Sequence, residues 1–171
     1  MKIFLIGYRC TGKTSVGKIL SEKLNLLFVD CDFYLQENEK TTISEIVAKK
    51  GWNHFRTLES KYLDEISQKE NIVVSTGGGV VESLYNIDLI KSRGIGIWLK
   101  AKSSTIKKRI LSDENTKDLR PSLTGLSKED EIDEVLKKRE PLYKKVSSLA
   151  FDTDSIGADE LADLIIKELT I

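Results

Sequence analysis

The stretch GYRCTGKT at residues 7–14 decides the fold of this chain. An apolar run at residues 3–6 precedes it, and an amphipathic helical pattern at residues 16–24 follows it. The order is therefore strand, loop and helix, with the pattern G-x-x-x-x-G-K-[ST] at the junction. In such a phosphate-binding loop (P-loop), successive backbone N–H groups point inward and meet the positive end of a helix. A glycine turn that merely opens a helix is disfavoured, because Gly12-Lys13-Thr14 stands in register after the strand.

Two side chains of the P-loop have expected roles. Lys13 can reach the β- and γ-phosphates of a bound nucleotide, and Thr14 can offer its hydroxyl to Mg²⁺. The loop alone predicts nucleotide binding and leaves the reaction open.

The composition is typical of one globular domain over residues 1–171, and it limits the partners. Lys and Arg together number 27, as do Asp and Glu, so no excess of basic charge predicts a nucleic-acid or membrane partner. The sequence shows no signal-peptide pattern and no apolar run that approaches membrane-spanning length. Cys10 and Cys31 do not form a disulfide framework or a structural zinc spacing. The expected compartment is therefore the cytoplasm.

Strand and helix patterns alternate along the whole chain. Such alternation predicts a three-layer α/β fold in which helices cover both faces of a parallel sheet. The expected strands are 3–6, 26–29, 72–75, 95–99 and 150–152. After the helix at 16–24, a helix is expected at 42–50, and Gly51 ends it. The next expected helix carries Phe55, Leu58, Tyr62 and Ile66 on one face. Further helices are expected at 82–93, 105–111, 127–138 and 159–169.

Asp30 and Asp32 follow the second expected strand. The carboxyl ends of parallel strands face the ligand crevice, and alternation along extended backbone would turn both carboxylates to one side. Two carboxylates beside a triphosphate suit Mg²⁺ and a substrate hydroxyl. The alternative is a polar loop in which an aspartate caps a helix.

The third expected strand runs into Ser75-Thr76-Gly77-Gly78-Gly79. Three glycines let backbone approach a ligand closely, although a plain flexible turn would have the same composition. Because these glycines, the P-loop and the aspartates all follow strands, we expect them to gather along one edge of the sheet.

Arg56 and Glu59 lie three residues apart on an expected helix and can pair. Spacing alone favours a surface ion pair of little energetic value. The functional alternative is an arginine that a carboxylate holds in place to bind a substrate carboxylate. His54, the single histidine, is expected to be a surface or packing residue.

Residues 112–125 are polar and weakly periodic. They fit either a surface loop or a lid that closes over the phosphates and excludes water. In the second case Arg120 would be an arginine finger supplied by the same chain.

On these residues the chain closely resembles shikimate kinases, over nearly its whole length. Five separated signatures occur in order: residues 7–14, Asp30-x-Asp32, Phe55-Arg56-x-x-Glu59, Ser75-x-Gly77-Gly78-Gly79, and Arg120-Pro121 followed by Arg139-x-Pro141-Leu142-Tyr143. The resemblance implies a P-loop kinase with a five-stranded parallel sheet. It also implies transfer of the ATP γ-phosphoryl group to the 3-hydroxyl of shikimate, a step of chorismate and aromatic amino acid biosynthesis, by a monomer.

The resemblance implies a role for each matching residue. The catalytic residues would be Lys13, Asp32 and Arg120. ATP would contact Cys10, Thr11, Gly12, Lys13, Thr14, Ser15, Arg109 and Arg120. Shikimate would contact Asp32, Arg56, Gly78 and Arg139, with a substrate-binding region at about 33–62 and a lid at about 112–125. Thr14 would bind Mg²⁺ directly, and Asp30 and Ser75 would bind it through water.

The chain departs from the family pattern at three places. Cys10 stands where the P-loop usually has a glycine, which adopts φ > 0 more freely than cysteine does. The stretch between Arg109 and Arg120 is a few residues longer than usual. The segment after Phe151 lacks an obvious basic residue for an adenine pocket.

Two other functions stay open on the sequence. One is a different small-molecule kinase of the same fold, such as a gluconate kinase or a nucleoside monophosphate kinase, although Arg56, Arg139 and the aspartate pair suit a carboxylated polyol better than a second nucleotide. The other is a non-catalytic nucleotide-binding module, which would not need to retain Lys13, Asp32 and Arg120.

Overall fold

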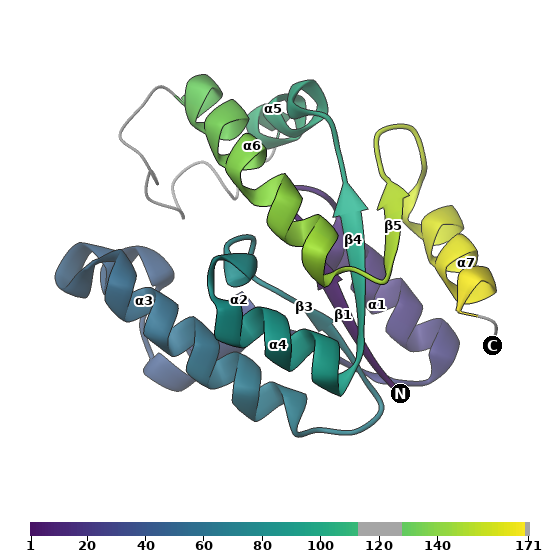
Figure 1. Ribbon diagram of the computed structural model, residues 1–171, viewed down its shortest axis with the longest axis horizontal. Helices are drawn as coiled ribbons and strands as arrows, with labels where there is room; N and C mark the ends of the chain where they lie inside the picture. The colour runs from purple at the N-terminus through teal and green to yellow at the C-terminus, as the bar shows by residue number, and fades with distance from the viewer. Residues whose placement is uncertain (113–127, 170–171) are drawn as a thin grey trace.

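A single parallel sheet organises the chain in a computed structural model that describes residues 1–112 and 128–169. Its five strands lie in the order β2-β3-β1-β4-β5 (Figure 1). Their bounds are Lys2–Ile6 (β1), Leu27–Asp30 (β2), Ile72–Ser75 (β3), Ile95–Lys100 (β4) and Leu149–Asp152 (β5). Leu5 of β1 pairs with Ser75 of β3 and with Ile97 of β4, so the predicted sheet is confirmed with β1 at its centre.

Helices follow the strands in the expected alternation. Their bounds are Lys13–Leu24 (α1), Cys31–Glu39 (α2), Ile43–Ser67 (α3), Leu84–Arg93 (α4), Ser103–Ser112 (α5), Lys128–Val146 (α6) and Ala158–Glu168 (α7), with a 3₁₀ turn at Val80–Glu82 (η1). No helix among the described residues is long and apolar enough to cross a membrane.

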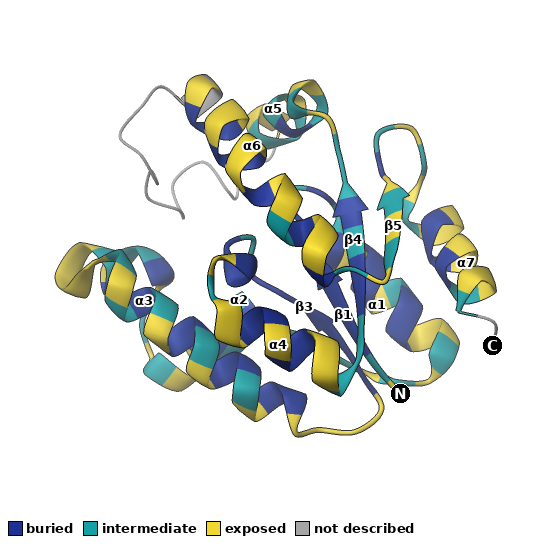
Figure 2. Ribbon diagram, in the orientation of Figure 1, coloured by how far each residue is buried: buried dark blue, intermediate teal, exposed yellow. Residues whose placement is uncertain are grey.

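Side chains alternate across the sheet and form a core on each face. Phe4 and Ile6 of β1 point to the face covered by α3, α4 and α6, where they meet residues such as Leu63. Ile3 and Leu5 point to the other face and pack against α1 and α7. Figures 1 and 2 show this arrangement, in which the central strands β1 and β3 are buried between helices that are themselves buried on one side. The three-layer α/β fold is thereby confirmed.

The backbone at residues 30–32 differs from the sequence prediction. Alternation along extended chain predicts that Asp30 and Asp32 point the same way, whereas β2 ends at Asp30 and α2 begins at Cys31. Asp30 caps this helix, because its Oδ1 accepts hydrogen bonds from the N–H groups of Asp32 and Phe33 at 3.1 and 3.2 Å. The premise of an extended backbone is therefore wrong and the helix cap is present, although Asp30 and Asp32 still line the same hollow over the P-loop.

The predicted helix break at Gly51 is confirmed, because Gly51 has a non-helical φ of 78° and ψ of 169°, so α3 consists of two helices joined at a kink. Two other helix bounds differ clearly from expectation. Residues 80–82 form η1, so α4 begins at Leu84 rather than at Glu82. Helix α6 extends to Val146, past the predicted end at 138, and contains Pro141. Because α6 continues, Arg139 and Tyr143 lie one turn apart on it.

Candidate active site

The P-loop backbone needs the left-handed region at three positions. Gly7, Cys10 and Gly12 have φ of 142°, 60° and 90°. A Cβ at Gly7 would lie 2.4 Å from the carbonyl oxygen of Leu99, so no side chain fits there. Cys10 adopts the conformation that glycine usually supplies, at a steric cost of roughly 1–2 kcal/mol. Cysteine therefore occupies a strained position of this loop.

Lys13 lies across the P-loop. Its Nζ donates hydrogen bonds to the carbonyl oxygens of Gly7 at 2.9 Å and Tyr8 at 2.7 Å. Thr11 also donates to the Tyr8 carbonyl, at 2.8 Å. Charged phosphate oxygens are stronger acceptors than carbonyls, so a nucleotide can draw Lys13 from these contacts.

The three residues predicted to bind the cation come together. The Thr14 hydroxyl donates to Asp30 Oδ2 at 2.8 Å and lies 3.3 Å from the Ser75 hydroxyl. Asp30 therefore uses one oxygen to cap α2 and the other to contact Thr14. Hard oxygen ligands of this kind fit a divalent cation such as Mg²⁺.

Two adjoining hollows meet at Asp32 and Gly78. The first lies over the P-loop and is lined by residues that include Lys13, Thr14 and Ser75. The second, called here the acceptor pocket, is lined by residues that include Arg56, Glu59 and Arg139. Since Asp32, Gly78 and Arg9 line both, a group held in the acceptor pocket can reach the phosphate hollow.

Arg56 and Glu59 form an ion pair with 2.8 Å between Nη1 and Oε2. The Glu59 side chain is only 4% exposed, so the surface pair that spacing alone favours is not what forms. Burial raises the pKa of Glu59 to about 7, and Asp32 adds to the shift while Arg56 opposes it. The Arg56 guanidinium lies 5.5 and 5.2 Å from the ring centres of Trp52 and Phe55, which hold it over the pocket.

The glycine triplet makes room for side chains as well as for a ligand. A Cβ at Gly77 would lie 2.4 Å from Glu59 Oε1 and 3.0 Å from Asp32 Oδ1. A Cβ at Gly79 would lie 2.1 Å from Arg56 Nη2. Gly78 faces the P-loop, where a Cβ would lie 3.4 Å from the backbone nitrogen of Arg9. The three glycines therefore allow Glu59, Arg56 and the P-loop backbone to approach closely, and do not merely form a flexible turn.

Helix α6 brings Arg139 and Tyr143 to the same site. Arg139 is 4% exposed, and its guanidinium lies 6.0 Å from the ring centre of Tyr8. The Tyr143 hydroxyl donates to the carbonyl oxygen of Gly78, and its ring stacks on Trp98. This bond ties the helix that carries Arg139 to the glycine triplet.

Arg109 joins the P-loop to the end of β5. Its Nη1 donates to the carbonyl oxygen of Cys10 at 3.1 Å and to the Thr153 hydroxyl at 3.0 Å. These residues line a further hollow together with Ile156 and Ser15. The hollow therefore lies beside the P-loop.

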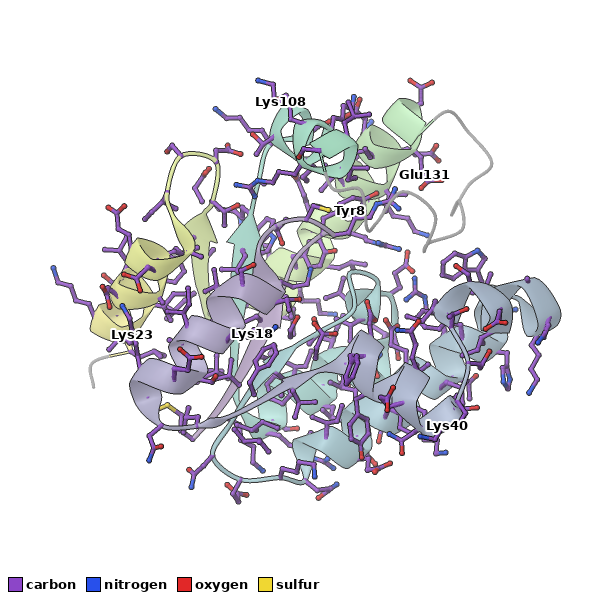
Figure 3. All side chains as sticks on the ribbon, turned by 180° about the vertical axis from the view of Figure 1, so that it is seen from behind. Tyr8, Lys18, Lys23, Lys40, Lys108 and Glu131 are labelled. Carbon is purple, nitrogen blue, oxygen red and sulfur yellow. The ribbon has the colours of Figure 1, made fainter. Side chains whose placement is uncertain are left out.

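Two acidic residues at the site carry no clear sequence signal. Glu131, 2% exposed, pairs with Arg9 at 3.2 Å, and Figure 3 shows it near Tyr8. Glu82 contacts both Arg56 and Arg139, the latter 57 residues away in the chain. Such contacts depend on the packing of α6 against η1.

The predicted lid beyond Ser112, and Arg120 with it, lie outside the described residues.

A P-loop on the central strand, beside a pocket that holds two arginines and an aspartate, defines a P-loop kinase acting on a small acidic molecule. The family model described as "Shikimate kinase" matches residues 9–170. The chain belongs to the shikimate kinase family.

Individual relatives agree with this assignment. A shikimate kinase of Azobacteroides pseudotrichonymphae is 42% identical over 170 residues, which cover 97% of this chain and 98% of that protein. Shikimate kinase 2 of Photorhabdus laumondii is 41% identical over 82% of this chain and 80% of its own length. The structure of shikimate kinase from Acinetobacter baumannii in complex with shikimate has a TM-score of 0.93 and 31% identity, and the match covers 99% of this chain and 92% of that one.

Proposed function

We propose that this chain transfers the γ-phosphoryl group of ATP to the 3-hydroxyl of shikimate, giving shikimate 3-phosphate and ADP in aromatic amino acid biosynthesis. One observation carries the proposal beyond family membership: Asp32 and Gly78 line both the phosphate hollow and the acceptor pocket. A substrate hydroxyl at this junction would lie between a carboxylate and the phosphates. Phosphoryl transfer depends mainly on such positioning and on electrostatics.

Arg56 and Arg139 bind the substrate carboxylate. Both line the acceptor pocket, and a guanidinium can form two parallel hydrogen bonds with a carboxylate. Asp32 and the backbone of Gly78 contact the ring hydroxyls. A carboxylated molecule with several hydroxyls satisfies this set, whereas a nucleoside monophosphate has no carboxylate for the two arginines to bind.

Asp32 orients the attacking 3-hydroxyl and accepts its proton. The new bond joins the hydroxyl oxygen to the γ-phosphorus, and the bond from that phosphorus to the oxygen shared with the β-phosphate breaks. Lys13 and Arg120 neutralise the charge on the transferred group and on the departing ADP.

A divalent cation is expected for an ATP-using kinase of this family, and Mg²⁺ is the ion we propose. Thr14 would hold it directly, and Asp30 and Ser75 would hold it through water. The cation supplies positive charge to the phosphate oxygens. The support is the contact of the Thr14 hydroxyl with both other side chains.

The other residues of the P-loop and Arg109 bind the nucleotide. Cys10, Thr11, Gly12 and Ser15 surround the phosphates, and Arg109 contacts the adenine end. Residues 33–62 form the substrate-binding region. The enzyme works as a monomer, as the resemblance to its family implies, and in the cytoplasm without a nucleic-acid partner. The equal numbers of acidic and basic residues and the lack of a disulfide framework support the last two proposals.

A coupled ADP-release assay with Mg·ATP tests the proposal. Release should depend on shikimate and should be lost with gluconate, with nucleoside monophosphates and with the methyl ester of shikimate, which lacks the carboxylate charge. ATP binding without turnover on any hydroxylated acid would instead favour the non-catalytic module. Turnover on another hydroxy acid alone would reassign the substrate.

A further inference from the structure

Glu82 ends η1, three residues after the glycine triplet, and joins two elements of the acceptor pocket. The 3₁₀ turn packs against both α3 and α6. Glu82 Oε2 lies 3.3 Å from Arg56 Nη2, and Glu82 Oε1 lies 3.3 Å from Arg139 Nε. Each carboxylate oxygen thus holds a different arginine.

The positive charges of Arg56 and Arg139 favour a carboxylate between them. Arg56 and Arg139 bring two positive charges to one pocket, and these repel each other at short range. Partial burial alone would raise the pKa of Glu82, but Arg139 and Arg56, with Lys138, hold that pKa below its ordinary value. Glu82 is therefore ionised at neutral pH and counters the repulsion between the arginines.

Glu82 approaches the arginines from outside the acceptor pocket. The described residues that line the pocket include Arg56 and Arg139 but not Glu82. Glu82 lines a neighbouring surface hollow, which it shares with Glu134 and with both arginines. Its side chain is 27% exposed there. A substrate carboxylate can enter the pocket while Glu82 stays in place.

Resting on the function proposed above, we propose that Glu82 is a positioning residue, which fixes Arg56 and Arg139 as one preformed clamp for the substrate carboxylate. A clamp that is ordered before binding loses less side-chain entropy when the substrate arrives. A second possibility makes the opposite prediction: Glu82 could weaken the clamp, because its negative charge opposes that of the substrate.

Two variants separate these possibilities. Glu82→Gln keeps the length of the side chain and removes its charge, whereas Glu82→Asp keeps the charge and is too short to reach both arginines. A preformed clamp predicts that each variant raises the KM and the calorimetric Kd for shikimate about tenfold, with kcat and the KM for ATP unchanged within about twofold. A charge effect alone predicts a lower KM in Glu82→Gln and an unchanged KM in Glu82→Asp.

Glu134→Gln and Lys138→Ala are matched controls. Glu134→Gln removes one negative charge from the same hollow, and Glu134 has no ion pair with either arginine among the described residues. Lys138 is 72% exposed and lies 3.5 Å from Glu82. Both variants should keep the wild-type KM for shikimate. A thermal unfolding scan shows which variants fold. Either Glu82 variant is enough to test the preformed clamp, because the two possibilities predict different KM values for each of them.

The outcomes distinguish this proposal from the proposed function. No shikimate-dependent ADP release by the wild type would overturn the function, while calorimetric binding of shikimate would still test the clamp. Wild-type turnover with a lowered or unchanged KM in both Glu82 variants would overturn the clamp alone. A fall in kcat at constant KM would also overturn it, since Glu82 would then affect the transfer step.

Discussion

The guanidinium of Arg56 lies directly against the Cα atom of Gly79. A Cβ built at Gly79 would be 2.1 Å from Nη2 and 2.4 Å from Cζ of Arg56. The third glycine of the triplet is therefore needed to accommodate an arginine side chain. The glycine backbone thus lies behind the arginine, and the arginine lines the acceptor pocket.

Gly79→Ala should weaken shikimate binding without unfolding the protein. The added methyl group meets the flexible end of a side chain, so the guanidinium moves and the backbone stays. A displacement of about 1 Å at a binding group can reduce the rate about 100-fold, so we expect the kcat/KM for shikimate to fall 10- to 100-fold. The KM for ATP and the unfolding temperature should change little.

Gly157→Ala is the matched control for this prediction. A Cβ at Gly157 has no neighbour within 4 Å, and φ there is −72°. Steady-state kinetics of both variants decide the point. Equal kcat/KM for shikimate in Gly79→Ala and the wild type would contradict the role assigned to Arg56.

Local sequence patterns predicted most of the fold and much of the site. The P-loop and the strand patterns depend on residues close in the chain, and the carboxyl ends of parallel strands then bring Thr14, Asp30 and Ser75 together. The contact between Arg56 and Glu59 follows from helical spacing.

Features that depend on distant packing could not be predicted in this way. Spacing places Glu59 beside Arg56 but does not reveal that Glu59 is buried against Gly77. Glu82 gives no local signal, because its partner Arg139 comes from α6. The extension of α6 past Pro141 was missed for a similar reason, since packing of the helix outweighs the lost hydrogen bond.

Asp32→Asn should abolish most turnover and leave ATP binding nearly intact. Asparagine keeps the shape of the side chain but cannot accept a proton from the 3-hydroxyl. Loss of a general base typically reduces kcat by about 10²–10⁴-fold. Asp88→Asn, on the exposed side of α4, is the control and should behave as the wild type. A near-normal kcat in Asp32→Asn would remove Asp32 from the mechanism.

Variants of Cys10 should separate the backbone of the P-loop from its side chain. Cys10→Gly relieves the strain of a positive φ but loosens the unfolded chain, so the stability should stay within about 1 kcal/mol and the KM for ATP within about twofold. Cys10→Val places a branched side chain at φ of 60° and should destabilise the fold by roughly 1–2 kcal/mol. Urea unfolding and ATP kinetics measure both effects. A large rise in the KM for ATP in Cys10→Gly would instead assign a binding role to the thiol.

Glu59→Gln should change how stability depends on pH. Burial raises the pKa of Glu59 in the folded protein from its ordinary value of 4.5 to about 7, so the folded state binds the proton more tightly than the unfolded state does. The contribution of this group to stability is complete below about pH 4.5 and is lost as the pH rises to about 7. Glutamine does not ionise, so this loss is absent from the variant.

The stability of Glu59→Gln relative to the wild type should therefore increase between pH 5 and pH 8. The upper limit is roughly 3 kcal/mol, because each tenfold difference in proton affinity between the folded and unfolded states corresponds to about 1.4 kcal/mol. Urea unfolding at several pH values measures it. Glu70→Gln is the control. Because Lys2 lowers the pKa of Glu70, the effect of this group on stability changes with pH only below pH 5. The stability difference between Glu70→Gln and the wild type should therefore be constant from pH 5 to 8. A flat difference for Glu59→Gln as well would mean that Glu59 stays ionised throughout this range, with Arg56 compensating its burial.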